Sequence, residues 1–356
     1  MNKIKSDVYS PYKAAKYMDK IEQLKKGELI TPTFVQLDPT NVCNLNCSFC
    51  FYRQTWDENQ KLKDWDADKM IPSERLMSLL DEFKDMGIEG IELTGGGSAE
   101  CHPTFDDFVV KAHEMGFNLA LVTNGTLLNL SRLQLLIDFD WVRFSVDAAN
   151  SKTWMDIKGM RDPDMFNCIL ERIRNFVKIK QDKCVVGLSM IICDKNYKEI
   201  YEFAKMAKDI GVENVRFSLA HVPNAKEMFD PIWDECVKLM EKAKTLEDNK
   251  FRVFIFKNRI YELRAEFGAQ PCPYQEFVAV ITPTGVYPCC LFKARTEYNL
   301  GDINKQSFKE IWYGEKRKKF VDRCKKFGCT GYCWMREKNN FIQYLIDKDV
   351  PHRCFI

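Results

Sequence analysis

Helix-like and strand-like hydrophobic patterns alternate along most of the chain. Between Ile71 and Gly87, apolar residues recur at steps of three and four, which predicts an amphipathic helix that ends at Gly87. The same periodicity predicts further helices over 105–116, 164–180 and 198–211. Short apolar runs predict strands over 34–37, 88–94, 118–123, 141–147, 184–192 and 215–220. Strands that alternate with helices indicate βαβ units and a parallel sheet.

Six repeats of this kind favour an open or partial barrel over a flat dinucleotide-binding sheet. The glycine run Gly95–Gly97 lacks the GxGxxG spacing, and no acidic residue stands at the expected distance beyond it. In such barrels the chemistry gathers at the carboxyl ends of the strands. At the carboxyl ends of the predicted strands lie a cysteine loop after the first, GGGS after the second, TNG after the third, SVD after the fourth and His221 after the sixth. We therefore expect an α/β fold, a partial (β/α)6 barrel whose functional residues lie in these loops.

The pattern changes after the sixth repeat. A helix predicted over 231–247 and an apolar run over 251–256 come first, and short strands, turns and cysteines follow from Gln270. Residues 278–290 read as a hairpin. We place a domain boundary near residue 260. The expected domains are a helical extension (1–32), the barrel (33–260) and a small cysteine-rich domain (261–356).

Length and charge narrow the classes of function. The chain has 356 residues and 46% hydrophobic content, enough for one large domain with an appendage. It contains no run of 18 or more apolar residues and no secretory signal, so we expect no membrane partner and a cytoplasmic location. A net charge of +2 argues against nucleic acid as a partner.

The fifteen cysteines are unusual for a cytoplasmic protein, where disulfides are rare and clustered cysteines more often hold metals or iron–sulfur clusters. Three lie between Cys43 and Cys50, and seven lie beyond residue 270. The other five are scattered, and we expect them to be small buried hydrophobic residues. These five are Cys101, Cys168, Cys184, Cys193 and Cys236.

Cys43, Cys47 and Cys50 offer three thiolates in one loop. Structural zinc takes four ligands, and no fourth cysteine or histidine follows within fifty residues. A [4Fe–4S] cluster normally takes one thiolate per iron, so three thiolates leave one iron open for another ligand. A zinc knuckle or a set of inert cysteines is the alternative.

The spacing Cys43-x3-Cys47-x2-Cys50, with Phe49 inside and Phe51 behind, follows the first strand and resembles the signature of the radical S-adenosylmethionine (SAM) superfamily. The resemblance covers about residues 33–222. It implies that the open iron binds SAM, that one electron cleaves SAM to methionine and a 5′-deoxyadenosyl radical, and that this radical removes a hydrogen atom from a substrate. It also implies a one-electron donor such as flavodoxin or ferredoxin.

The same resemblance implies further cofactor-binding positions. TGGGSAECHP resembles the glycine-rich motif whose backbone receives the amino group of SAM, although Ser98 stands where the family usually has glutamate; Glu100 is a candidate to compensate. Lys158 stands where an arginine often meets the SAM carboxylate. The other implied positions are Phe49, Gly95, Gly96, Gly97, Thr123, Asn124 and Ser145. His221, at a strand end, is a candidate catalytic residue, and a structural histidine is the alternative.

The later cysteines resemble a SPASM-type auxiliary domain, which implies at least one auxiliary [4Fe–4S] cluster. One of the adjacent Cys289 and Cys290 is expected to be a ligand, and the sequence does not distinguish them. A two-cluster version needs another cysteine where Val321 stands. We expect one cluster on Cys272, Cys289 or Cys290, Cys329 and Cys333, with Cys324 and Cys354 available to an incomplete second one. A zinc-bound tail is the alternative.

These features predict a radical SAM oxidoreductase or epimerase. Only about 32 residues precede the first strand, too few for a separate peptide-recognition module, so we expect a small-molecule substrate rather than a peptide. The main hypothesis is dehydrogenation or epimerisation of a sugar or cyclitol. One alternative is a maturase that modifies a ribosomally made peptide, and another is a non-catalytic metal-binding module.

Overall fold

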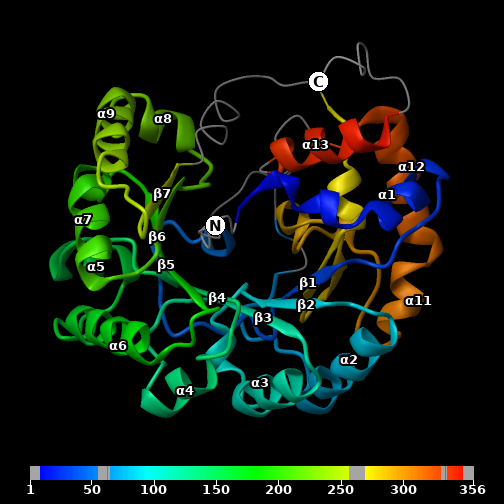
Figure 1. Cartoon of the computed structure of the whole chain (residues 1–356), viewed down its shortest axis with the longest axis horizontal. Helices are drawn as coiled ribbons and strands as arrows, with labels where there is room; N and C mark the ends of the chain where they lie inside the picture. The colour runs from blue at the N-terminus through cyan, green and yellow to red at the C-terminus, as the bar shows by residue number, and fades with distance from the viewer. Residues whose placement is uncertain are drawn as a thin grey trace.

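The computed structural model describes residues 9–54, 62, 65–255, 269–329, 333 and 335–347. Its core is a curved sheet with strand order β7-β6-β5-β4-β3-β2-β1-β8-β9 (Figure 1). Neighbouring strands from β7 to β8 are parallel, and β8 and β9 form an antiparallel hairpin. The strands are β1 (Phe34–Leu37), β2 (Gly90–Leu93), β3 (Asn118–Thr123), β4 (Trp141–Ser145), β5 (Val185–Ile192), β6 (Asn214–Leu219), β7 (Arg252–Ile255), β8 (Val278–Thr282) and β9 (Gly285–Tyr287).

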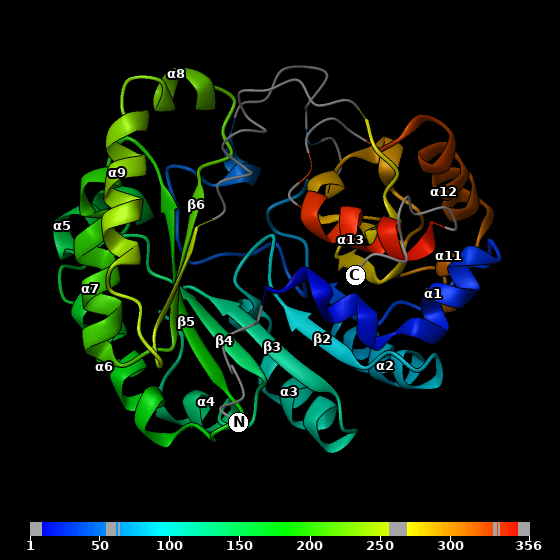
Figure 2. The ribbon, with the colours of Figure 1, turned by 45° about the horizontal axis from the view of Figure 1, so that its top comes forward.

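Helices cover the outer face of this sheet, and the remaining helices pack around the β8–β9 hairpin (Figures 1 and 2). The α-helices are α1 (Met18–Lys25), α2 (Ser73–Asp85), α3 (Phe105–Glu114), α4 (Leu130–Leu135), α5 (Ser151–Lys158), α6 (Met165–Ile179), α7 (Ile200–Ile210), α8 (Ala225–Phe229), α9 (Trp233–Lys244), α11 (Phe308–Trp312), α12 (Glu315–Phe327) and α13 (Arg336–Ile346). Short 3-10 helices are η1 (Pro11–Lys16), η2 (Phe51–Arg53), η3 (Ala99–Cys101), η4 (Tyr197–Glu199), η5 (Pro273–Glu276), η6 (Cys290–Phe292) and η7 (Thr296–Tyr298).

The alternation of side chains along each strand separates an outer from an inner face. In β4, Val142 and Phe144 are fully buried, and the ring of Phe144 contacts Phe176 of α6. Arg143 and Ser145 point to the opposite face and stay partly exposed. Successive residues of a strand project to opposite faces, so the apolar positions pack against the helices and the polar ones line the inside of the barrel.

The auxiliary domain shares the barrel's sheet, because β8 pairs in register with β1, Phe34 opposite Val278 and Leu37 opposite Ile281. The amino-terminal extension packs on the same domain. A second hydrophobic core joins α1 with the hairpin and α13, and it consists of Ile21, Ile30, Tyr274, Phe277, Val278 and Ile342. The extension is therefore held by the carboxyl-terminal part of the chain.

The predicted alternation of strands and helices, the partial barrel and the hairpin are all confirmed. The apolar run at 251–256 forms a seventh parallel strand, β7. In the extension, the helices are limited to η1 and α1 among the residues that the structure describes. The boundary placed near residue 260 falls at 256–268, outside the described residues. No described helix has the length and apolar character needed to cross a bilayer.

Candidate functional site

The cysteine loop leaves the carboxyl end of β1 and is fastened to the end of α5. The backbone N–H groups of Asn46 and Ser48 donate to the carbonyl oxygens of Lys158 (2.9 Å) and Ile157 (2.8 Å). Gly159 ends α5 at φ +66°, and a Cβ there would lie 2.7 Å from the Asn46 oxygen. The loop and the helix end therefore need this glycine to approach so closely.

The three cysteines of this loop lie within electrostatic reach of one another. Burial raises the pKa of Cys47 to about 11, the Lys158 ammonium opposes the shift, and charge on Cys50 or Cys43 adds to it. Burial also raises the pKa of Cys50, and a hydrogen bond from the backbone N–H of Tyr52 opposes this shift. All three side chains are half-buried, without disulfides. Three close thiols that repel one another as thiolates fit a site where bound iron supplies the compensating positive charge.

The glycine-rich loop packs directly on the residues that lead into the cysteine loop. The N–H of Gly97 donates to the carbonyl of Thr40 (3.0 Å). A Cβ on Gly97 would lie 2.0 Å from the Val42 oxygen, and one on Gly96 would lie 2.6 Å from the Trp65 ring. These glycines are therefore needed for close packing between two protein segments, in addition to any approach to a ligand.

Glu100 is the centre of a buried hydrogen-bond network below this loop. Its carboxylate accepts from the hydroxyls of Ser98 (2.7 Å) and Thr123. Asn124 Nδ2 donates to Ser98 Oγ (3.3 Å) and to Asn44 Oδ1 (3.1 Å). Glu100 is 3% exposed, and no ion pair engages it within the described part of the chain. The network thus joins the motif position of Ser98, the end of β3 and the cysteine loop around one buried negative charge.

Lys158 lies behind the cysteine loop with its charge already paired. Its ammonium donates to Asp147 in an ion pair in which both side chains are almost fully buried, and to the Ser145 carbonyl (2.9 Å). The ring of Phe49 lies 5.8 Å from the same ammonium. Ser189 Oγ donates to Ser145 Oγ (3.3 Å) on the inner face of the sheet. The cofactor contacts expected of these residues remain predictions.

The scattered cysteines separate into two groups. Cys184, Cys193 and Cys236 are buried, as expected. The expectation is wrong for Cys168, which is exposed, and for Cys101, which is half-buried beside the cysteine loop, where the N–H of Asn44 donates to its sulfur. Cys101 lies 51 positions after Cys50, so sequence distance alone gave no sign of this neighbourhood.

His221 lies where the barrel meets the cysteine loop. Its ring stacks on Phe51, with centroids 5.3 Å apart and planes 16° apart. Phe51 directly follows Cys50. The histidine after β6 is therefore next to the candidate site, and its catalytic role remains a prediction.

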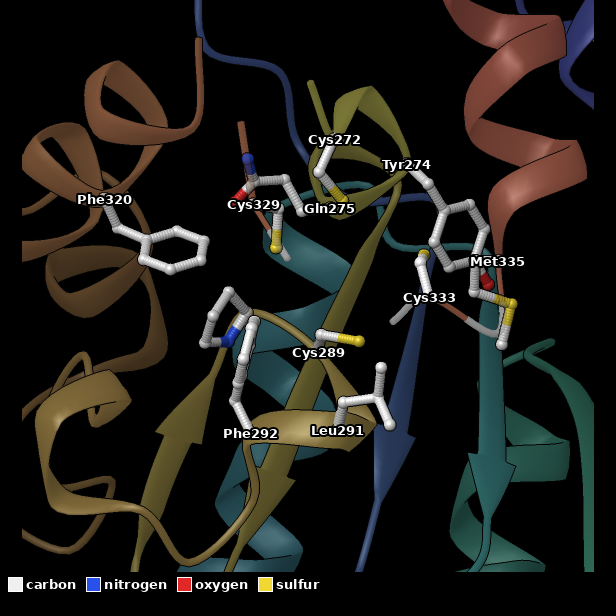
Figure 3. A pocket seen from close by; sticks show the side chains of 11 residues that line it. Cys272, Tyr274, Gln275, Cys289, Leu291, Phe292, Phe320, Cys329, Cys333 and Met335 are labelled. Atoms are coloured by element: carbon white, nitrogen blue, oxygen red, sulfur yellow. The ribbon is translucent and has the colours of Figure 1, made fainter. Parts of the chain in front are cut away.

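A second set of cysteines surrounds one cavity in the auxiliary domain. In Figure 3 the sulfur atoms of Cys272, Cys289, Cys329 and Cys333 face a common space. Among the described residues, no three metal-binding side chains converge as the ligands of a single ion do. A polynuclear cluster instead needs thiolates spread around it, because each binds a different iron. The four thiols fit an auxiliary cluster.

Backbone geometry separates Cys289 from Cys290. Cys289 is extended, at φ −159° and ψ 152°, and lines the cavity, whereas Cys290 begins η6 and is absent from the lining. The Cys290 side chain hydrogen-bonds with Cys289 and lies near Tyr52 and Lys293, toward the first cysteine set. Cys324 is buried in α12 and hydrogen-bonds with Cys329. Cys354 falls outside the described residues.

A buried ion pair connects the two cysteine sets. Lys293 of the auxiliary domain donates to both oxygens of Asp38, at the end of β1, at 2.9 and 2.8 Å. Burial acts to lower the pKa of Lys293, but the Asp38 charge outweighs it and raises that pKa. The ring of Tyr52 stacks on Trp65 beside the pair, with centroids 4.1 Å apart. Sequence reasoning missed this contact, because Asp38 and Lys293 carry no motif.

Two family models match the chain. Residues 37–207 match the radical SAM superfamily, and residues 272–335 match SPASM, an iron–sulfur cluster-binding domain. The first match contains the cysteine loop, the glycine-rich loop and Lys158. The second begins at Cys272 and contains the four cavity cysteines.

Relatives extend the similarity over most of the chain. A tungsten-containing aldehyde ferredoxin oxidoreductase cofactor-modifying protein of Pyrococcus furiosus is 26% identical over 87% of this chain and 89% of its own. The antilisterial bacteriocin subtilosin biosynthesis protein AlbA of Bacillus subtilis is 24% identical over 86% of this chain and 67% of its own.

Solved structures share the fold. Streptococcus suis SuiB bound to its precursor peptide SuiA has a TM-score of 0.64 at 15% identity and covers 96% of this chain and 80% of its own. A structure of anSMEcpe with bound AdoMet, which is SAM, has a TM-score of 0.58 at 17% identity and covers 90% of this chain and 97% of its own.

The preference for a small-molecule substrate over a peptide is wrong. It rested on the few residues before the first strand, whereas one relative and one solved structure are named for peptides. AlbA is named for the biosynthesis of a bacteriocin, and the SuiB structure contains a precursor peptide. A short amino-terminal segment is therefore a poor guide to the substrate.

Proposed function

The chain belongs to the radical SAM superfamily and carries a SPASM domain, and on this basis we propose that it modifies a ribosomally made peptide by removing a hydrogen atom from it. The observation that carries the proposal is the similarity to a bacteriocin biosynthesis protein over 86% of this chain and 67% of that protein, together with the fold shared with a peptide-bound enzyme. The two cysteine sites of this chain would supply the chemistry that such a reaction needs.

Cys43, Cys47 and Cys50 would hold the cluster that binds SAM, because they are three close thiols in one loop. When bound, the cluster supplies the electron that cleaves SAM to methionine and a 5′-deoxyadenosyl radical. The protein's part is to hold the loop, which the bonds to the end of α5 do. The Lys158 ammonium, close behind Cys47, favours the thiolate form.

The Glu100 network supports the neighbouring loop in this proposal. Its carboxylate fixes the hydroxyls of Ser98 and Thr123, and through Asn124 it reaches Asn44 of the cysteine loop. The Arg132 guanidinium donates to the main-chain carbonyl of Glu100 (3.1 Å), and the carboxylate itself forms no ion pair among the described residues. A buried carboxylate of this kind favours a positively charged ligand, such as the amino group of SAM. We propose that Glu100 provides the charge that the usual motif glutamate, replaced here by Ser98, would provide.

Cys272, Cys289, Cys329 and Cys333 would hold an auxiliary cluster. Asn339 Nδ2 donates to the sulfur of Cys333 (3.4 Å), and hydrogen bonds to ligand sulfurs tune the potential of such clusters. The pairing of β1 with β8 and the Asp38–Lys293 pair hold this site in a fixed relation to the first one. The arrangement suits a reaction in which an electron leaves a substrate held between the two sites.

Transfer of deuterium from the substrate to 5′-deoxyadenosine tests the proposal. Peptides and small metabolites are prepared separately from the source organism grown in heavy water, and each pool is incubated without oxygen with the reconstituted protein, SAM and a reductant. Deuterium in 5′-deoxyadenosine from the peptide pool alone is the expected result. Deuterium from the metabolite pool alone would overturn the peptide assignment and leave the radical chemistry intact.

A further inference from the structure

Helix α12 (Glu315–Phe327) concentrates the positive charge of the chain. Seven of its 13 residues are lysine or arginine and two are acidic, although the whole chain has a net charge of only +2. The other residues of the chain are therefore net negative. Charge of one sign that gathers on one surface steers the association of partners that carry the opposite sign.

The helix separates a buried face from this charge. The residues of the buried face are Arg317, Phe320, Val321 and Cys324. The exposed basic residues are Lys316, Lys318, Lys319, Arg323, Lys325 and Lys326. Glu315 pairs with Lys318 (2.7 Å), and no other exposed cation of α12 forms an ion pair with a described residue. Asp322 is the second acid, so the exposed face keeps an excess of positive charge.

An aromatic ring ends this basic face. Phe327 is the last residue of α12 and is 66% exposed, and the ammonium of Lys326 lies 5.0 Å from the centroid of its ring. Figures 1 and 2 both place α12 on the outside of the auxiliary domain, across the molecule from α7 and α9. The face thus offers a partner basic side chains together with one apolar contact.

The buried face of the same helix adjoins the auxiliary cysteine cavity. Phe320 lines this cavity and points from α12 toward the thiols (Figure 3). Cys324, one turn later, is buried and hydrogen-bonds with Cys329. Cys329 also lines the cavity and stands two positions after the end of the helix. A helix with its side chains is about 10–12 Å across, so one helix separates the basic face from the auxiliary site.

We propose that the exposed face of α12 docks an acidic one-electron carrier protein that exchanges electrons with the auxiliary cluster. One electron moves between the cluster and the carrier, so that one is oxidised and the other reduced, and no bond forms or breaks. Electron carriers make small, transient interfaces, for which one charged helix face is large enough. The inference goes beyond the proposed function, because it does not depend on the substrate.

Reversal of charge on α12 tests this docking surface. The variant carries Lys319→Glu with Lys326→Glu, and the control carries Lys205→Glu with Lys238→Glu at exposed positions of α7 and α9, which changes the net charge equally. Each reconstituted protein is mixed without oxygen with a photoreduced, acidic [2Fe–2S] ferredoxin, and reoxidation of the ferredoxin is followed by stopped flow. At low ionic strength we expect the α12 variant to react about 10-fold more slowly than wild type and the control to match wild type.

Salt and binding measurements complete the test. The wild-type rate should fall as salt is added, because salt screens exposed charges. A wild-type rate that does not depend on salt would overturn the inference, and this result needs no variant to fold. Equal rates for the two pairs of substitutions, or no reoxidation by wild type, would also overturn it.

Biolayer interferometry separates docking from general binding of anions. Weaker binding of ferredoxin to the α12 variant should accompany the slower reaction. Weaker binding with an unchanged rate would mean that electrons enter elsewhere and would overturn the assignment. Iron per chain should be equal in the three proteins. No peptide takes part in these measurements, so their outcome is independent of the deuterium transfer that tests the proposed function.

Discussion

The two cysteine sites of this chain are built in opposite ways. The first takes its three thiols from eight consecutive residues, Cys43 to Cys50, in a loop tied to the end of one helix. The second takes its four thiols from segments more than sixty residues apart, between Cys272 and Cys333, brought around one cavity by the hairpin and the segments near α12 and α13. The first is a local structure, and the second exists only in the folded domain.

This difference decides what a substitution does. In the first site, substitution of one cysteine changes the ligand set but leaves the loop's hydrogen bonds to α5 in place. In the second site the cysteines line a cavity inside the domain, so we expect substitutions there to affect the folding of the domain as well as its ligand set. Predictions that separate the two sites therefore compare cluster content with folding.

The largest effect is expected from Cys43→Ala. Removing one of three thiolates from the first site should abolish its cluster and leave the auxiliary one, so about half of the iron is lost. Iron and acid-labile sulfide per chain, measured after anaerobic reconstitution, check this. Cys168→Ala, at an exposed cysteine of α6, is the control and should retain all the iron. Equal iron in Cys43→Ala and the wild type would contradict the assignment.

The adjacent pair Cys289 and Cys290 sharpens the comparison in the second site. In the Cys43→Ala background, Cys289→Ser should remove most of the remaining iron, because Cys289 lines the cavity. Cys290→Ser should keep it, because Cys290 lies outside the lining. Iron content and the visible absorbance of the reconstituted protein give the answer. The reverse order would mean that the backbone turn at η6 assigns the wrong cysteine.

The ion pair between the two sites should affect folding more than cluster binding. Lys293→Met leaves the buried Asp38 carboxylate without a partner, and loss of one member of a buried pair costs about 3–5 kcal/mol in the free energy of unfolding. Adding Asp38→Asn should recover much of this loss. Denaturant unfolding of the two proteins measures the difference. A single variant as stable as the wild type would show that the pair does not hold the domains together.

The smallest functional effect is expected at the buried cysteines. Burial raises the pKa of Cys184 and of Cys236 to about 12, so at pH 8 their thiolate fraction is about a thousandfold below that of an ordinary thiol. Iodoacetamide should label Cys168 and leave these two unlabelled, with labelling increasing as the pH rises. Peptide mapping by mass spectrometry reads this out, and rapid labelling of Cys236 at pH 8 would contradict its burial.

The sequence predicted the local parts of this molecule well. Helix and strand periodicity predicted the order of the barrel elements, and the spacing of Cys43, Cys47 and Cys50 predicted three close thiols in one loop, because each depends on neighbouring residues only. The choice between Cys289 and Cys290 depends on a backbone turn, extended at one residue and helical at the next, which the sequence does not encode visibly. The position of Cys101 beside Asn44 likewise depends on how η3 packs.

The substrate was the part that sequence reasoning got wrong. The size of an amino-terminal segment says little about what enters the barrel, since the inner face is lined by alternate residues of separate strands. Arg216 reads as an ordinary strand residue, and only the strand register through Ser189 places it level with Ser145 on the inner face.

The measurement that tests the central claim most directly is the formation of 5′-deoxyadenosine. Wild type and Cys43→Ala are reconstituted without oxygen, matched for auxiliary iron, and given SAM and a reductant. We expect product from the wild type and none above background from the variant. Equal product from both, or none from wild type that holds its full complement of iron, would contradict the assignment of SAM cleavage to Cys43, Cys47 and Cys50.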